Sequence, residues 1–200
     1  MYGIYENGSV IAKFTTPMTV RSNRPVTVSD TLSLRRQTSL QTAQRWEIET
    51  GVEPLSFNAQ DLFVSLVTKG YSGTVTVLMP QNYGALMART QKVSSGTASG
   101  AAKATQVTLS NVQGFIPKGT FVQFGSHSKV YMTVADRVPA QAVVEIYPPL
   151  RKPVTAAEFR YCDDVMFKGL YDTNVVKGMV FDNGILMSMG TITIVEDLNA

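Results

Sequence analysis

Side chains that could carry out chemistry are few in this chain of 200 residues, which holds one histidine and one cysteine. The histidine, His127, lies between Ser126 and Ser128. A serine hydroxyl beside an imidazole could act as a nucleophile, because the ring can accept its proton. However, sequence neighbours rarely reach the required geometry, and no acidic residue stands near enough to orient the ring. We therefore favour a tight hairpin turn over a catalytic site here.

The cysteine lies in the run Cys162-Asp163-Asp164, which could be a reactive thiol or half of a carboxylate metal site. Adjacent acids on a strand point to opposite faces, so an inert cysteine beside a polar turn is the simpler interpretation. One cysteine also excludes an internal disulfide and a cysteine-built zinc site. The glycines before Lys103 lack the spacing of a phosphate-binding loop. We expect no metal, no cofactor and no enzymatic activity.

The sequence around these residues predicts mainly β-strands. Short segments alternate apolar and polar side chains, or are rich in β-branched and aromatic residues, and turn signals such as Asp182-Asn183-Gly184 separate them. This spacing indicates an antiparallel β-sandwich or barrel. The predicted strands are 45–49, 74–79, 106–109, 121–124, 129–134, 143–147 and 191–196.

One convincing helix is predicted over residues 59–69. Asn58 is a suitable N-cap, an apolar stripe runs from Leu62 to Val67, and Gly70 fits the position after the last turn. We expect this helix to cover one face of the sandwich. A shorter helix over residues 37–43 is a weaker prediction.

These elements suggest a division of the chain. Residues 94–103 are small and polar, and we expect a flexible linker or loop there. Residues 104–155 would form a small β-barrel or β-extension, and residues 1–93 and 156–200 would form the sandwich. No apolar run is long enough to cross a bilayer, and residues 1–8 show no secretory signal. We expect synthesis in a reducing cytoplasm.

The charge is +3 and is uneven, because the first 45 residues hold six basic side chains and two acidic ones. Their arginines lie among Thr, Ser, Val and Leu rather than aromatic residues, which favours a solvated or subunit-facing surface over nucleic-acid binding. We predict interface or architectural roles for Arg35, Arg36 and Arg45. We expect Trp46, the only tryptophan, to be a core anchor rather than a ligand platform.

Two parts of the chain resemble tail-tip proteins of tailed bacteriophages. The first is 44–51, the capped helix to Gly70 and the strand ending at Met79-Pro80; the second is 116–124, 129–131 and 146–151. Their order is similar to that in ring-forming baseplate proteins, namely the distal tail protein and the tail-tube initiator or junction proteins.

This resemblance implies a tail-tube-like β-sandwich with a flanking helix, and often an extra small barrel. It further implies a hexameric ring that joins the tail tube to the hub and the tape-measure protein, with DNA passing through its lumen. It implies a location in the virion tail, after assembly in the bacterial host cytoplasm, and no catalytic residues. Whether the tail would be contractile is left open.

Physical reasoning agrees with a ring, because an unprotected terminal strand at 191–195 could pair with a neighbouring copy. Two alternatives stay open. One is another virion structural role, such as a head–tail connector or a capsid-surface protein. The other is a nucleic-acid-binding β-barrel module formed by residues 104–150.

Overall fold

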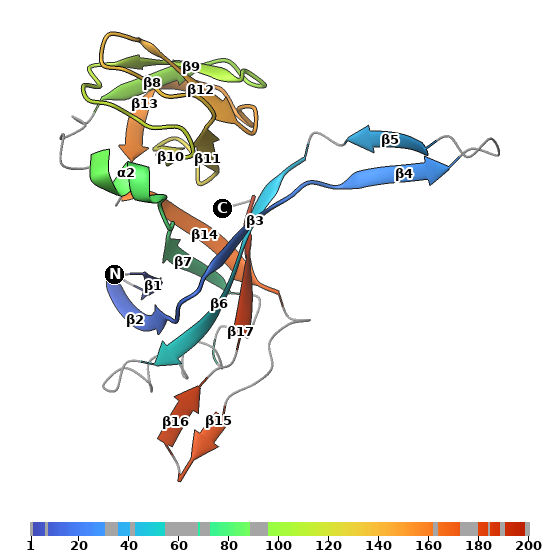
Figure 1. The fold of residues 1–200 in the computed structure, drawn as a ribbon. Coiled ribbons are helices and arrows are strands. Elements are labelled where there is room, and N and C mark those ends of the chain that lie inside the picture. Colours follow the sequence, from blue (N-terminus) through green and yellow to red (C-terminus); the bar gives the residue numbers. More distant parts are fainter. Residues whose placement is uncertain are drawn as a thin grey trace.

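The computed structural model describes residues 2–6, 8–30, 36–40, 43–54, 68, 73–88, 96–161, 164–172, 180–183, 185–188 and 191–198. Within these residues the protein is mainly β, which confirms the expected class, and its strands build two closed bodies and two separate hairpins (Figure 1). All seven predicted strand segments are strands.

The first body is a sheet of seven strands in the order β17-β14-β7-β1-β2-β6-β3. β6 also pairs with β17, from Gly51 opposite Thr191 to Glu47 opposite Val195, so the sheet returns to its first strand. The pairing therefore does not divide these strands into the two sheets of the predicted sandwich. The strands are β1 (Gly3–Glu6), β2 (Ser9–Phe14), β3 (Thr19–Asn23), β6 (Arg45–Pro54), β7 (Thr74–Leu78), β14 (Met166–Tyr171) and β17 (Thr191–Glu196).

The second body is a closed barrel with the strand order β10-β11-β12-β9-β8-β13. It is inserted between β7 and β14, which pair with each other in the first sheet. The short helix α2 (Tyr83–Ala88) lies on the connection into it. The strands are β8 (Thr97–Gly100), β9 (Gln106–Ser110), β10 (Phe121–Phe124), β11 (Val130–Thr133), β12 (Val143–Tyr147) and β13 (Val154–Tyr161).

The barrel is larger than the predicted segment 104–155, because β8 lies inside the predicted linker 94–103 and β13 continues to Tyr161. The small residues of β8 are there because the barrel is tightly closed. Ala98 is fully buried, and a side chain on Gly96 would meet the backbone oxygen of Ser110. Glycine in or beside a strand often marks such a close backbone approach.

Three further expectations need comment. The predicted helix 59–69 lies outside the described residues except for Thr68. The weaker helix prediction for 37–43 is wrong, because β5 (Arg36–Leu40) pairs with β4 (Val26–Asp30) along its whole length. The expectation of an unpaired strand at 191–195 is also wrong, since β17 pairs with β14 on one side and β6 on the other.

Each body has its own apolar core, and the two cores meet. Ile4, Ile48, Phe167 and Ile194 are among the most buried residues of the first sheet. Phe124 and Tyr131 are among the most buried residues of the barrel. Val130 belongs to the core of the first sheet although β11 is a barrel strand, and Phe121, Met132 and Tyr147 pack there too. The β10–β11 side of the barrel therefore faces the first sheet (Figure 1).

Candidate functional site

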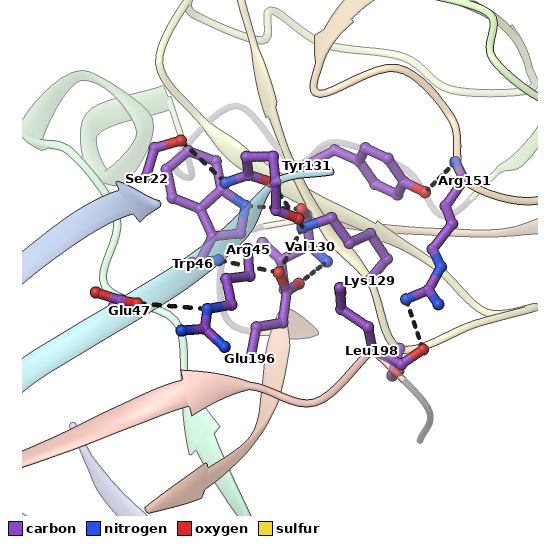
Figure 2. Close-up of polar contacts among 12 residues, drawn as sticks. Ser22, Arg45, Trp46, Glu47, Lys129, Val130, Tyr131, Arg151, Glu196 and Leu198 are labelled. Atoms are coloured by element: carbon purple, nitrogen blue, oxygen red, sulfur yellow. Dashed lines mark hydrogen bonds and ion pairs between the residues drawn. The ribbon is translucent and has the colours of Figure 1, made fainter. Parts of the chain in front are cut away.

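The first candidate site is the junction between the two bodies, which is organised around Glu196 (Figure 2). Glu196 is the last residue of β17 and is 4% exposed. Its carboxylate accepts hydrogen bonds from the backbone N–H groups of Trp46 (3.0 Å) and Val130 (2.9 Å). It also forms an ion pair with Lys129 of the barrel. One carboxylate thus connects β6, β17 and the start of β11.

The cation of this pair is equally well enclosed. Lys129 is 4% exposed, and its Nζ donates to the side-chain oxygen of Gln44 (2.8 Å) and the backbone oxygen of Gln44 (3.2 Å) as well as to Glu196. Burial lowers the pKa of Lys129, and the charge of Glu196 opposes that shift. Buried ion pairs persist where further hydrogen bonds complete both partners, as they do here.

Trp46, the second residue of β6, also takes part in the junction. Its ring N–H donates to the backbone oxygen of Val130 (2.8 Å). The ring meets Phe121 edge to face, with 5.2 Å between the ring centroids, and lies 6.4 Å from Tyr147 in a similar orientation. At 4% exposed, Trp46 is the buried anchor that the sequence predicts, and these contacts lie inside one chain.

The predicted interface arginines do not come together in one described cluster. Arg35 lies outside the described residues, and Arg36 begins β5, where only the backbone is described. Arg45 begins β6; its side chain is 50% exposed, with Nε 3.4 Å from the carboxylate of Glu47. The subunit-facing role of the three arginines stays a prediction.

The second candidate site surrounds His127 at the edge of the junction. Its Nδ1 lies 3.0 Å from Ser126 Oγ, and its Nε2 lies 2.7 Å from Tyr131 Oη. The backbone N–H of Arg151 donates to the same phenol oxygen (3.1 Å). Burial raises the pKa of Tyr131 to about 12, so the phenol keeps its proton.

The polarity of this chain of hydrogen bonds can be assigned. Tyr131 Oη accepts from Arg151, so we direct its own proton to Nε2 of His127. The neutral ring then carries its proton on Nδ1 and donates to Ser126. Burial and the charges of Lys152, Arg151 and Lys129 lower the pKa of His127, which favours this neutral form. Ser126 Oγ accepts a hydrogen bond here, whereas a nucleophile next to a base must donate its proton toward the ring.

Cys162 and Asp163 lie outside the described residues. Among the residues that the structure describes, no group of three or more His, Cys, Asp or Glu side chains could hold a metal ion. Over the same part of the chain, no helix has the length and apolar character needed to span a membrane.

The third candidate site is a two-stranded arm formed by β4 and β5 (Figure 1). Within the described residues, these strands pair only with each other, from Val26 opposite Leu40 to Asp30 opposite Arg36. The arm continues the ribbon of β3 and β6, which ends with Asn23 opposite Arg45. The sequence predictions did not include this arm, although Val26-Thr27-Val28-Ser29 alternates as a strand does.

A comparison of the chain with protein-family models finds no match, and no curated protein matches it significantly.

Proposed function

We propose that this protein is a non-enzymatic ring subunit of a bacteriophage tail tip or baseplate. In this proposal, copies of the chain close around an axis as a hexamer of tail-tube-like domains with their flanking helices. The ring joins the tail tube to the hub and the tape-measure protein, and it continues the channel through which DNA passes. The protein would be assembled in the host cytoplasm and reside in the virion tail.

The observation that carries the proposal is the β4–β5 arm. Within the described strands, the arm is paired only along its inner edges, so its two outer edges are available for another strand. A two-stranded ribbon is marginally stable alone in water, and an open edge is a template for pairing with another chain. Such an arm is stabilised when neighbouring copies pair with it.

The two open edges differ, so the edge of one copy can pair with the other edge of the next copy. One edge belongs to β4 and the other to β5, so pairing β4 of one copy with β5 of the next is a heterologous contact. Heterologous contacts generate closed rings or open filaments, depending on whether the rotation between copies closes. The terminal strand β17 has no part in this argument, because both of its edges are paired within the chain.

Particle imaging and native mass spectrometry of the full chain test this proposal, alone and together with tail proteins. We expect rings for the natural chain and loss of rings when residues 26–40 are replaced by a short Gly-Ser linker. The matched control replaces residues 180–188, which hold the hairpin of β15 (Val180–Asp182) and β16 (Ile185–Ser188), by the same linker. Monomers alone from the natural chain, or rings from the arm-less chain, would contradict the proposal.

A second candidate, the nucleic-acid-binding barrel, is favoured by one observation. Residues 97–161 hold seven basic side chains and three acidic ones, although Lys129 and Arg137 are buried. Binding of DNA by the full chain with a steep dependence on salt concentration would support this function. A weak or flat salt dependence would leave the ring as the better proposal.

Another virion structural role would be indicated by rings that assemble with head proteins instead of tail proteins.

A further inference from the structure

Three exposed valines lie at the connection between β11 and β12 of the barrel: Val134 and Val138 within it, and Val143 at the start of β12. Val134 is 48% exposed, Val138 is 43% exposed and Val143 is 42% exposed. Only two other large apolar side chains of the described residues are exposed to a similar degree, Val26 and Met87. Single exposed apolar residues are common, so these valines gain meaning only together with the cavity and the charges next to them.

An open cavity of about 370 Å³ adjoins this connection, and of the three valines Val143 lines it. Its wall consists of Gln106 from β9 and of residues 135–137 and 141–145. This volume falls in the range of about 300–1,000 Å³ that is typical of binding pockets. β9 lies on the side of the barrel that is remote from the first sheet (Figure 1), and the cavity is lined by the start of β12 rather than by Tyr147 at its end. The surface is therefore separate from the junction and from the arm.

The wall of the cavity is held in place by Arg137, which is 4% exposed. Its guanidinium donates to the backbone oxygens of Gln141 (2.8 Å), Gly114 (3.0 Å) and Val112 (2.8 Å). The backbone of Arg137 also exchanges two hydrogen bonds with Ile116 (2.9 and 2.8 Å). The connection is thus fixed before any partner arrives, which reduces the entropy lost on binding.

The acidic side chains at the cavity are exposed to solvent, whereas its one basic side chain is buried. Asp136 and Glu145 are exposed, and the positive charge of Arg137 is buried against backbone oxygens. Asp136 accepts a hydrogen bond from the backbone N–H of Lys118 (2.7 Å), and Glu145 accepts one from the side chain of Gln106 (3.1 Å). Among the described residues, no ion pair involves either carboxylate.

We infer that this surface binds an extended segment of another protein that carries branched aliphatic side chains next to lysine or arginine. The valines and the cavity receive the aliphatic side chains, and the two carboxylates attract the basic ones. Complementary charge of this kind selects the partner and steers its approach. The same carboxylates repel phosphate groups, which disfavours nucleic acid at this face. The inference does not depend on the proposed ring, because it uses residues of the barrel only.

An NMR titration of the ¹⁵N-labelled full chain tests this inference with two synthetic pentapeptides, Val-Lys-Val-Lys-Val and Val-Glu-Val-Glu-Val. We expect the lysine peptide to shift the amide signals of residues 134–145, and the glutamate peptide to leave them unchanged. Equal shifts with both peptides, no shifts, or shifts confined to other residues would overturn the inference. The same shifts on raising the protein concentration alone would identify a second copy as the occupant and would also overturn it.

Conservative variants separate the effect of charge from that of folding. Asp136→Asn and Glu145→Gln each keep a side-chain oxygen that can accept the existing hydrogen bond. Together they should weaken binding of the lysine peptide by about fivefold, given the usual strength of exposed ion pairs. Glu158→Gln is the matched control, since Glu158 is exposed on β13 and pairs with Arg160. A control variant that weakens binding equally would contradict the assignment of this surface.

Discussion

At the scale of single residues, Glu196 and Lys129 contribute unequally to the junction. The carboxylate of Glu196 accepts two backbone N–H groups in addition to the ammonium group of Lys129. Without Lys129, the carboxylate of Glu196 still accepts hydrogen bonds from two backbone N–H groups. Without Glu196, those two N–H groups and the buried ammonium group of Lys129 all lose the carboxylate as a partner. Breaking a buried pair by removing one partner typically costs about 3–5 kcal/mol.

We therefore predict that Glu196→Leu lowers the free energy of unfolding by at least about 3 kcal/mol, and that Lys129→Met lowers it by less. Urea unfolding followed by far-ultraviolet circular dichroism, which reports on all strands, measures both changes. Arg160→Met is the control, because the Arg160–Glu158 pair is exposed and should contribute below about 1 kcal/mol. A larger loss from Lys129→Met than from Glu196→Leu would contradict this assignment.

His127 makes stability depend on pH. Its pKa is lowered in the folded protein by burial and by Lys152, Arg151 and Lys129, so the unfolded chain binds a proton more readily. Stability should therefore fall as the pH drops below the ordinary histidine pKa of about 6.5, until the lowered folded pKa is passed. Part of the drop in Tm between pH 7.5 and pH 5 should disappear in His127→Gln.

Comparison of the variant with the natural chain isolates this contribution, because carboxylates titrate in both proteins. Ser126→Ala is the matched control, since it keeps the ring and its contact with Tyr131. An equal drop in Tm for the natural chain and His127→Gln would show that the ring does not titrate differently on folding.

The junction also shows which site residues can be predicted from sequence. Trp46 is identifiable, because a lone tryptophan in an alternating strand is commonly a core anchor. Glu196 is identifiable in principle, because side chains alternate along a strand and Glu196 therefore lies on the same face as Ile192 and Ile194. All three residues are buried. Its partner Lys129 lies 67 residues earlier in the chain. Local periodicity carries no information on a contact at that separation, so the pair emerges only from the fold.

At the scale of elements, alternating strands are predictable and small-residue strands are not. The segments 106–109 and 191–196 have apolar side chains on every second residue, and each is a strand. β8 has the sequence Thr-Ala-Ser-Gly, whose composition is that of a linker. It is a strand because its neighbours approach closely, and this is a property of the closed barrel. Pairing with the preceding strand β4 makes β5 a strand, although its sequence suggested a helix.

Gly96, next to β8, gives a test of this close approach. A Cβ atom there would lie 2.4 Å from the backbone oxygen of Ser110, which cannot move without disturbing the β8–β9 pairing. We predict that Gly96→Ala destabilises the protein by about 1–3 kcal/mol, as overpacking usually does. Thermal unfolding measures the change.

Gly84 in α2 is the matched control, since the nearest atom to a Cβ there is 3.5 Å away. Alanine is favoured over glycine within a helix, so Gly84→Ala should leave stability unchanged or raise it by up to about 1 kcal/mol. If Gly96→Ala were as stable as Gly84→Ala, the strand assignment of β8 would lose its physical basis.

At the scale of the whole molecule, the junction couples two bodies that each have a complete core. The barrel is reached and left through two connections, between β7 and α2 and between β13 and β14. Connections alone would let the bodies move and unfold independently. The hydrogen bonds of Glu196, Lys129 and Trp46 oppose this, because any separation would break a buried ion pair and the two buried backbone hydrogen bonds of Val130.

The whole-molecule prediction is that the two bodies unfold together in the natural chain and separately once the junction is broken. Trp46 fluorescence reports on the junction and far-ultraviolet circular dichroism reports on all strands, so in the natural chain both should change at the same urea concentration. In Glu196→Leu the fluorescence change should occur at lower urea, because the bodies part before either core melts. Arg160→Met should keep the two transitions coincident. Coincident transitions in Glu196→Leu would show that the apolar contacts of Phe121, Val130 and Tyr147 couple the bodies without the ion pair, and that Glu196 sets stability but not cooperativity.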